Sequence, residues 1–281
     1  MPVDYAFISC KRQAGCTSLR SELGRIINHD TSHLALKPII LIPARLGSTR
    51  LPGKILADIG GKPMILHVLD RALQSGLGPV AVACGEAEIA QAVQAHGGVA
   101  VMTDPDLPSG SDRIFSALEK LDAANQYDVI INLQGDLPLI PPAYLRAVLS
   151  PLKKNYDIGT LVVPITSMTE ATTPSIVKCA CAFDDQPDAN QDVAPALYFS
   201  RNPVPSGEGP LWHHIGIYAY HRAALARFVK LPPSPLEQRE KLEQLRALEA
   251  GMRIGVARVA QAIFGIDTPE DLERARKMSA L

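Results

Sequence analysis

Short apolar segments alternate with helical ones from Lys37 onwards. The apolar runs Pro38–Pro43, Val80–Cys84, Ala100–Thr103 and Val129–Leu133 have the length and the polar boundaries of buried strands. Between these runs, helical patterns occupy the segments Met64–Gln74, Ala87–His96 and Asp112–Leu121. Near-continuous apolar strands separated by helices are typical of a sheet that is covered on both faces. The pattern therefore predicts an α/β fold with a three-layer, mainly parallel sheet.

The second half of the chain is richer in strand-like patterns. After the helical segment Tyr144–Leu152, strand candidates follow at Gly159–Ile165, Ile176–Phe183, Ala196–Ser200 and His214–Tyr220. We therefore expect the sheet to continue with antiparallel or mixed pairing. A helix is predicted over Leu236–Ala250, where Gly251 ends it, and Thr268 and Pro269 are expected at the N-cap and first position of the closing helix.

The segment Met1–Lys37 has no sustained periodicity beyond a short helical pattern near Ser18–Asn28. We expect it to be a poorly ordered N-terminal extension outside the core. The rest of the chain, residues 38–281, contains no internal repeat and no low-complexity linker, so it is expected to form one domain.

Composition and charge exclude several classes of protein. The chain has 28 Lys and Arg against 29 Asp and Glu, a net charge of −1, so it lacks the basic excess of a nucleic-acid or membrane-surface binder. We expect no nucleic-acid partner and no membrane partner. No apolar run is long enough to cross a bilayer, and the N-terminus lacks a secretory signal, which together favour a cytoplasmic location. No C-x-x-C pair occurs, so we expect free thiols at Cys10, Cys16, Cys84, Cys179 and Cys181.

A loop with three positive charges, residues 43–54, follows the first predicted strand. Its small residues allow backbone N–H groups to face an anion, and Arg45, Arg50 and Lys54 supply cations for a polyphosphate. The spacing is not that of a Walker A loop, and Ile55 stands where that motif has Ser or Thr. The alternative is a solvated basic loop without a ligand.

Carboxylates follow two other apolar stretches. Gln134 and Asp136 follow Val129–Leu133, and Asp267 follows the apolar residues 262–266. Because Mg²⁺ takes one or two protein carboxylates together with phosphate oxygens, Asp136 and Asp267 are candidate metal ligands. The alternatives are an Asx turn before Pro138 for Asp136 and a helix-capping role for Asp267.

Further polar candidates are weak one by one. They are the stretch Ser109–Arg113 at a helix start, Arg201 after a strand, the pair His213 and His214, and the pair Glu243 and Gln244. A helix cap, a surface cation, strand-edge imidazoles and a solvated helix face would explain them without a function.

Taken in order, these segments resemble the 3-deoxy-manno-octulosonate (Kdo) cytidylyltransferase family. The motifs that carry the resemblance are Ile42–Lys54, Gly61–Met64, Leu66–Val68, Ser109–Arg113, Gln134–Asp136, Leu197–Arg201, His214–Tyr218, Pro235–Glu237, Leu242–Arg246 and Asp267–Leu272. They span the predicted core. The loop at 43–54 and the Gln-Gly-Asp step are shared with other sugar nucleotidyltransferases, whereas the motifs in the second half narrow the resemblance to Kdo enzymes.

The resemblance implies a nucleotide-diphospho-sugar transferase (glycosyltransferase-A-like) fold and a cytoplasmic homodimer. The reaction it implies joins CTP to Kdo, with Mg²⁺ as cofactor, and gives CMP-Kdo and pyrophosphate for lipopolysaccharide biosynthesis. The nucleotide-binding residues it implies are Ala44, Arg45, Arg50, Lys54, Ser109, Gly110 and Ser111. It implies a Kdo pocket of Gln134, Arg201, His214, Glu243 and Gln244, and catalytic roles for Lys54 and for the metal ligands Asp136 and Asp267.

The chain departs from the family pattern at three places. Leu137 replaces a common Glu after Gln-Gly-Asp, Cys84-Gly85 replaces a common Thr-Asp pair, and the stretch between Arg201 and His213 is short. Two other hypotheses about the function stay open. One is a sibling enzyme such as a CMP-sialic acid synthetase, and the other is a non-catalytic nucleotide-binding protein that has kept the fold.

Overall fold

The computed structural model describes residues 36–48, 50–183 and 192–279. The chain divides into two units, residues 1–36 and 37–281, and all but one of the described residues belong to the second unit. The expectations for the N-terminal extension, its short helix, Cys10 and Cys16 lie almost entirely outside the described residues and stay predictions. Cys84, Cys179 and Cys181 are free thiols and all three are buried.

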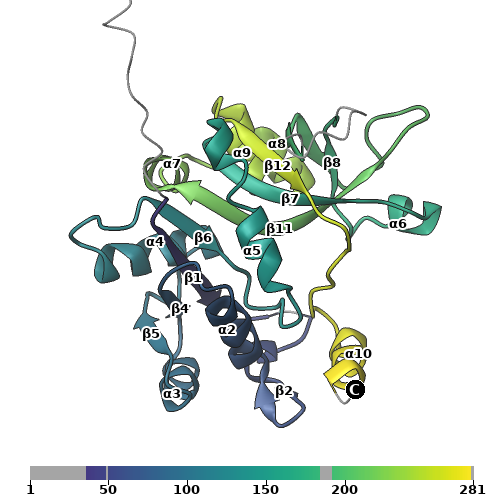
Figure 1. Ribbon diagram of the computed structural model, residues 1–281. Coiled ribbons are helices and arrows are strands. Elements are labelled where there is room, and N and C mark those ends of the chain that lie inside the picture. The colour runs from purple at the N-terminus through teal and green to yellow at the C-terminus, as the bar shows by residue number, and fades with distance from the viewer. Residues whose placement is uncertain (1–35, 49, 184–191, 280–281) are drawn as a thin grey trace, which may run out of the picture. The chain divides into compact units, whose positions relative to one another are not determined.

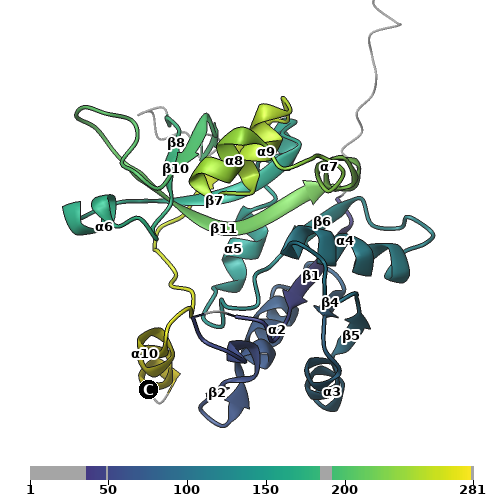
Figure 2. The same ribbon diagram turned by 180° about the vertical axis from the view of Figure 1, so that it is seen from behind.

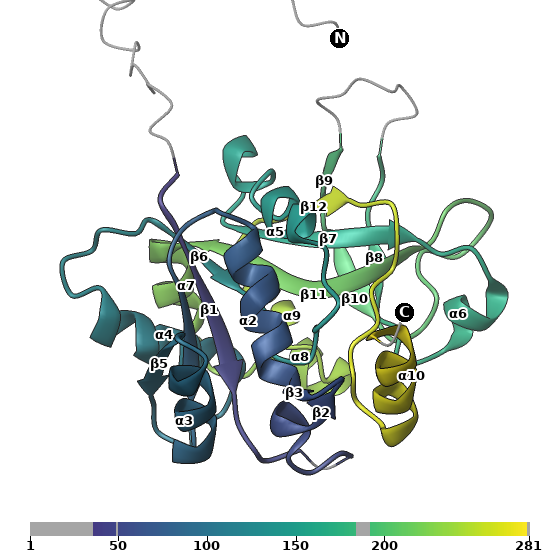
Figure 3. The same ribbon diagram turned by 60° about the horizontal axis from the view of Figure 1, so that its bottom comes forward.

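The first half of the second unit is a parallel sheet. Strands β1 (Pro38–Ala44), β4 (Val80–Cys84), β5 (Val99–Met102) and β6 (Val129–Asn132) lie in the order β5-β4-β1-β6 and pair in parallel. The connecting helices are α2 (Met64–Gln74), α3 (Ala87–Ala95) and α4 (Gly110–Leu121). Figures 1 and 3 show α2 and α3 on one face of the sheet, and Figure 2 shows α4 on the other. The predicted strands and helices of this half are confirmed.

The two connections that leave and re-enter this sheet create an opening at its carboxyl edge. Helix α2 leads from β1 to β4, whereas α4 passes across the opposite face to reach β6 on the other side of β1. Where neighbouring connections diverge in this way, the loops after the two strands separate. Ligands of open α/β sheets bind in that crevice.

The second half extends the sheet with mixed pairing, as expected. Its strands are β7 (Ile158–Pro164), β8 (Lys178–Ala180), β9 (Val193–Pro195), β10 (Tyr198–Ser200), β11 (Trp212–His221) and β12 (Ile254–Arg258). The long strand β11 runs antiparallel to both β6 and β7, and β12 pairs in parallel with β7. The result is a ten-stranded mixed sheet. Strands β9 and β12 have no counterpart among the sequence predictions.

Shorter elements complete the unit. The helices are α5 (Pro142–Ala147), α6 (Met168–Thr172), α7 (Arg222–Phe228), α8 (Pro235–Glu240), α9 (Gln244–Glu249) and α10 (Pro269–Ser279), with 3-10 turns η1 (Lys54–Leu56) and η2 (Leu152–Lys154) and a hairpin of β2 (Asp58–Ile59) and β3 (Lys62–Pro63). The backbone N–H of Asp271 donates to Thr268 Oγ1 at 3.2 Å, which confirms Thr268 as the cap of α10. No helix among the described residues has the length and apolar character needed to span a membrane.

The prediction of one continuous helix over Leu236–Ala250 is wrong. The segment forms α8 and α9, which residues 241–243 separate, and the φ of Lys241 is left-handed at 57°. The break turns the chain so that Leu242 and Leu245 are both buried in the core. Arg246 then reaches back across it and donates from Nε to Glu237 Oε2 at 2.8 Å. Burial of the two leucines therefore overrides the helical periodicity.

The predicted helix over Tyr144–Leu152 is also shorter than expected. Helix α5 ends at Ala147, and Leu152 belongs to the separate turn η2. Pro151 lies between them. Proline lacks the N–H that a continuing helix would use and restricts the residue before it.

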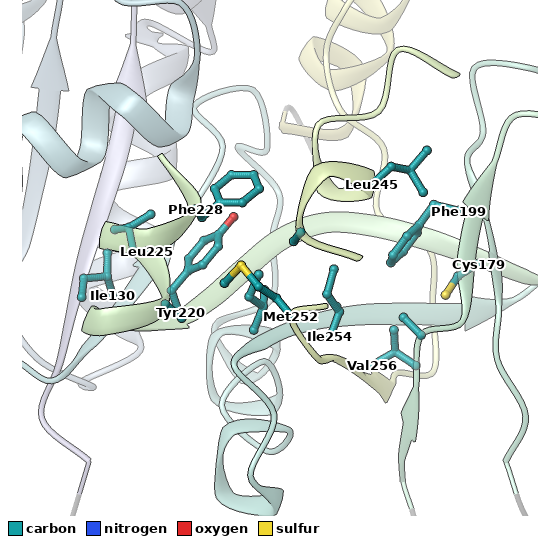
Figure 4. Packing of buried hydrophobic residues seen from close by; sticks show 14 of the residues in the cluster. Ile130, Cys179, Phe199, Tyr220, Leu225, Phe228, Leu245, Met252, Ile254 and Val256 are labelled. Atoms are coloured by element: carbon teal, nitrogen blue, oxygen red, sulfur yellow. The ribbon is translucent and has the colours of Figure 1, made fainter. Parts of the chain in front are cut away.

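One large hydrophobic cluster lies between the sheet and the helices α4, α7 and α9, which cover one of its faces. Figure 4 shows its centre, where Ile130, Tyr220, Leu225, Phe228, Leu245, Met252, Ile254 and Val256 pack together. Phe199 and Cys179 extend it towards β8 and β10. This packing fixes the sheet whose carboxyl edge carries the candidate site.

Candidate active site

A cleft of about 350 Å³ opens at the carboxyl ends of β1 and β6, in the crevice that the topology predicts. It is lined by Pro43, Ala44, Arg45, Gly47, Ser48, Arg50, Lys54, Ile55, Leu107, Ser109, Gly110, Arg113, Gln134, Gly135, Asp136 and Asp267. Four separate segments of the chain supply these residues. Most of the predicted nucleotide and metal residues are therefore brought together in one place.

The basic loop after β1 is held by its own backbone. Gly53, with a φ of 68°, donates its N–H to Leu46 O at 3.2 Å, and Lys54 begins the turn η1 directly after it. A residue with a side chain would be strained at that left-handed φ. The turn places the Lys54 side chain in the cleft beside Arg45 and Arg50, which are exposed. Three cations therefore face one opening.

Lys54 lies between the two predicted metal carboxylates. Its Nζ donates to Asp136 Oδ2 at 2.8 Å and to Asp267 Oδ1 at 2.7 Å, and also to Ile266 O at 3.0 Å. Arg50 Nη2 donates to the other oxygen of Asp267 at 2.9 Å. Burial lowers the pKa of Lys54, but the two carboxylates more than offset this, so its pKa lies above the ordinary value. Lys54 is therefore charged at neutral pH.

A segment from the far end of the chain brings Asp267 to this site. The backbone N–H of Ile266 donates to Asp136 O at 3.0 Å, which ties the segment before α10 to the loop after β6. Figure 1 shows this segment running from β12 to α10 beside β2. The capping carboxylate of α10 is Asp271, which accepts from the backbone N–H of Thr268 at 3.0 Å. Asp267 therefore directs its own carboxylate to the cleft.

The carboxylates of Asp136 and Asp267 are ligands of the kind that a divalent cation takes, and the Lys54 ammonium occupies the point between them. Both bind the same Lys54 Nζ, so their oxygens converge on one point, and their side chains remain 29% and 40% exposed. Within the described part of the chain, no cluster of three or more His, Cys, Asp or Glu side chains could hold a metal ion. Two carboxylates are sufficient for Mg²⁺, because water and phosphate oxygens supply its other ligands.

Ser109 and Gly110, at the start of α4, form another part of the cleft wall. Ser109 is the N-cap of α4 and accepts from the backbone N–H of Asp112. At Gly110, a Cβ would come within 3.3 Å of Pro43 Cγ, so glycine allows the helix start to approach the end of β1. Ser109 and Gly110 line the cleft, whereas Ser111 is buried and donates to Glu243 Oε2 at 3.2 Å.

The five predicted sugar-acid residues are not all brought together. Gln134 lines the cleft, and Glu243 lines a neighbouring hollow with Pro108 and Asp112. Gln244 is buried at the start of α9. Glu243 Oε1 is buried and has no hydrogen-bond partner among the described residues, and burial raises the pKa of this carboxyl.

The remaining two are occupied by contacts within the protein. Arg201 Nε donates to Glu240 O at 2.7 Å, and its guanidinium also reaches the carbonyls of Pro174 and Lys241. His214 lies within hydrogen-bond distance of Thr160, with Nε2 3.0 Å from Oγ1, and burial lowers its pKa to about 3.

Arg113 also lines this cleft, although the sequence patterns predict no role of its own for it. Its guanidinium is buried and donates from Nη1 to Thr103 Oγ1 at 2.7 Å and to Asp104 O at 3.0 Å, and from Nη2 to Pro105 O at 3.0 Å. The signal that could have identified it is its position one turn into a helix whose first residues face the basic loop.

Comparison with known proteins gives the family of the chain. The cytidylyltransferase family model matches residues 39–254. A 3-deoxy-manno-octulosonate cytidylyltransferase from Paramagnetospirillum magneticum is 58% identical over 244 residues, which are 86% of this chain and 98% of the relative. The chain belongs to the 3-deoxy-manno-octulosonate cytidylyltransferase family. Another member, from Afipia carboxidovorans, is 56% identical over 90% of this chain and 98% of its own length.

Solved structures agree with this family and its fold. The structure of a CMP:2-keto-3-deoxy-manno-octonic acid synthetase complexed with CTP matches with a TM-score of 0.78 and 43% identity, over 87% of this chain and 98% of the other. A nucleotidyl transferase from Methanothermobacter matches with a TM-score of 0.54 at 17% identity, which shows the fold alone, over 87% and 98% of the two chains. The predicted family, the nucleotidyltransferase fold and the class of enzyme are confirmed.

Proposed function

We propose that this cytidylyltransferase transfers CMP from CTP to Kdo and releases pyrophosphate, and that its product CMP-Kdo serves lipopolysaccharide biosynthesis. The observation that carries the proposal is the convergence of Lys54, Asp136 and Asp267 in a cleft that also holds Arg45 and Arg50. Its membership in a family of Kdo cytidylyltransferases names the two substrates. The proposal also includes the roles of the site residues and Mg²⁺ as the cofactor.

The cations of the cleft would hold the triphosphate. CTP is strongly anionic, and Kdo carries a carboxylate, so the two substrates repel each other until positive charge offsets the repulsion. Arg45 and Arg50 can donate to the phosphates that leave as pyrophosphate. The three N–H groups of Lys54 donate to Asp136, Asp267 and Ile266 O, so Lys54 would donate to a phosphate oxygen after releasing one of these acceptors. Ala44, Ser109, Gly110 and the buried Ser111 would shape the place of the nucleoside.

Asp136 and Asp267 would hold Mg²⁺. When bound there, the ion would neutralise phosphate charge and lower the pKa of the attacking hydroxyl. The C2 hydroxyl of Kdo attacks the α-phosphorus in line and its proton passes to water. The new P–O bond forms, the bond from the α-phosphorus to the bridging oxygen breaks, and that oxygen leaves with pyrophosphate. The protein holds the two reactants in that alignment, and no side chain becomes a covalent intermediate.

Kdo would bind beyond Gln134, towards the second half of the sheet. Gln134 lines the cleft, and Glu243 offers a carboxyl oxygen without a partner that can accept from a sugar hydroxyl. The bond from Ser111 to Glu243 joins the nucleotide stretch to this region. In our proposal Arg201, His214 and Gln244 complete the pocket.

The test is pyrophosphate release by the purified protein. We expect release with CTP, Kdo and Mg²⁺, and none when UTP or ATP replaces CTP. Release with N-acetylneuraminate in place of Kdo would assign a sibling reaction. A folded protein that binds CTP and releases no pyrophosphate with either sugar acid would support a non-catalytic nucleotide-binding role and contradict the proposal.

We also propose a cytoplasmic homodimer. Buried free thiols at Cys84, Cys179 and Cys181 suit a reducing compartment. The homodimer is the assembly that the family resemblance implies, and Met168 and Leu197, which are 75% and 68% exposed, are apolar side chains that a second copy would cover. Light scattering of the purified protein should give twice the chain mass, and a monomer at micromolar concentration would contradict the dimer.

A further inference from the structure

The turn between β4 and α3 is hydrogen-bonded to the basic loop on both sides of Arg45. The backbone N–H of Gly85 donates to Ala44 O at 3.0 Å, which continues the pairing of β1 with β4 by one residue. One residue beyond Arg45, the backbone N–H of Leu46 donates to Glu86 Oε2 at 3.1 Å. Both neighbours of Arg45 are therefore held by this turn, while the Arg45 side chain remains exposed in the cleft.

Glu86 holds the loop instead of capping its own helix. It occupies the N-cap position of α3 with an extended backbone, yet its side chain accepts no hydrogen bond from that helix. Ser, Thr, Asp or Asn at this position would cap the helix and stabilise it. Glu86 gives no such stabilisation and instead accepts a hydrogen bond from Leu46, 40 positions away in the sequence. This indicates that the contact with the loop has a role of its own.

Gly85 has no side chain that could accept a hydrogen bond from the basic loop. The acceptor for the Leu46 N–H is therefore the carboxylate of Glu86, the next residue. A Cβ at position 85 would lie 3.1 Å from Arg113 Nη1, so the buried guanidinium occupies the space beside Gly85. Burial lowers the pKa of Arg113. The nearby positive charge of Arg45 also lowers this pKa, whereas the negative charge of Glu86 raises it. Glu86 thus also offsets the crowding of cations around the loop.

We propose that Glu86 is a positioning residue for CTP, whose carboxylate holds the Leu46 N–H and thereby aims Arg45 at the triphosphate. This inference rests on the proposed function, because it takes the cleft to be the CTP site. Holding the loop in its binding conformation before the nucleotide arrives removes an ordering cost from binding. Loss of the contact should therefore weaken CTP binding more than it slows the bound complex.

Two variants and a control test this. Glu86→Ser removes the loop contact and supplies a better N-cap, so it should raise KM and Kd for CTP about tenfold while the melting temperature stays equal or rises. Glu86→Gln keeps an acceptor oxygen and should stay within about threefold of the native values. Glu88→Gln removes a charge from the exposed first turn of the same helix and should leave both constants unchanged.

Calorimetry with CTP and steady-state kinetics with varied CTP give the readouts, and kcat should change less than KM. Native CTP affinity in Glu86→Ser would overturn the inference. So would a weakened affinity in Glu86→Gln equal to that of Glu86→Ser, or a loss of affinity that follows a fall in melting temperature. If the unmodified protein itself binds no CTP, the proposed function fails, which is a result distinct from these.

Discussion

Lys54 donates to Asp136 and Asp267 at once, and Arg50 donates to Asp267 from the other side. Two carboxylates and two cations therefore balance one another in a cleft that is open to solvent. The exposed pair of Arg50 with Asp267 contributes little to folding, about 0 to 1 kcal/mol, whereas the Lys54 side chain is only 13% exposed. The arrangement of these charges is better explained by the binding of charged ligands than by stability.

Asp136→Ala and Asp267→Ala should each lower turnover by at least about a hundredfold, because each removes half of the proposed metal site. The melting temperature should change by only a few degrees, since both carboxylates are partly exposed. Pyrophosphate release and thermal unfolding measure the two effects. Glu270→Ala is the matched control, because it removes an exposed carboxylate three residues beyond Asp267. Turnover near the native rate in either aspartate variant would contradict the metal assignment.

His214 should make stability depend on pH. Burial lowers its pKa to about 3 in the folded protein, against an ordinary value of 6.5. Between these values the unfolded chain binds a proton that the folded protein does not, so stability falls as the pH drops below 6.5. Going from pH 7 to pH 5, this group alone should lower the free energy of unfolding by about 2 kcal/mol.

Urea unfolding of the native protein and of His214→Asn at both pH values isolates this contribution. The variant should be less stable at pH 7 but lose less stability on acidification, because it has no imidazole to protonate. Equal losses in the two proteins would show that His214 is protonated in the folded state.

Among the elements, the break between α8 and α9 shows how packing overrides periodicity. The residues 236–250 have a helical pattern, but Lys241 takes a left-handed φ of 57° so that Leu242 and Leu245 reach the core. A left-handed conformation costs a residue with a side chain about 1 to 2 kcal/mol. Two bonds to Glu237 stabilise the result: the backbone N–H of Ser234 donates to Glu237 Oε2 at 3.0 Å, and Arg246 Nε donates to the same oxygen at 2.8 Å.

Lys241→Gly should therefore stabilise the protein by about 1 kcal/mol, because glycine adopts a positive φ without steric cost. The urea midpoint should rise. Lys241→Ala is the matched control, since it removes the same side chain and keeps the Cβ, and it should give no increase. A gain in both variants would assign the effect to the lysine side chain instead of the backbone.

In the unit formed by residues 37–281, a segment near its beginning and a segment near its end meet at the cleft. The loop after β1 supplies Lys54, and the segment after β12 supplies Asp267, which lies 213 positions further along. The described residues of the cleft all fall between Pro43 and Asp267. The site is thus built entirely within one of the two units.

Removal of residues 1–36 should leave kcat/KM for CTP within about twofold of the full chain, since the family match begins at residue 39 and the cleft lies beyond it. The truncated and full-length proteins can be compared in the same pyrophosphate assay and by thermal unfolding. A truncated protein that folds with the native melting temperature but has lost activity would show that the N-terminal segment acts in catalysis.

The sequence by itself determined the alternation of strands and helices, the basic loop, the two carboxylates and the family. These follow from local periodicity, from small and charged residues at strand ends, and from motifs in a fixed order. Only the tertiary structure decided that Arg113 lines the cleft, that Lys241 breaks a helix and that Glu86 bonds Leu46. Each of these depends on contacts between segments distant in sequence, where burial and hydrogen bonding outweigh local preference.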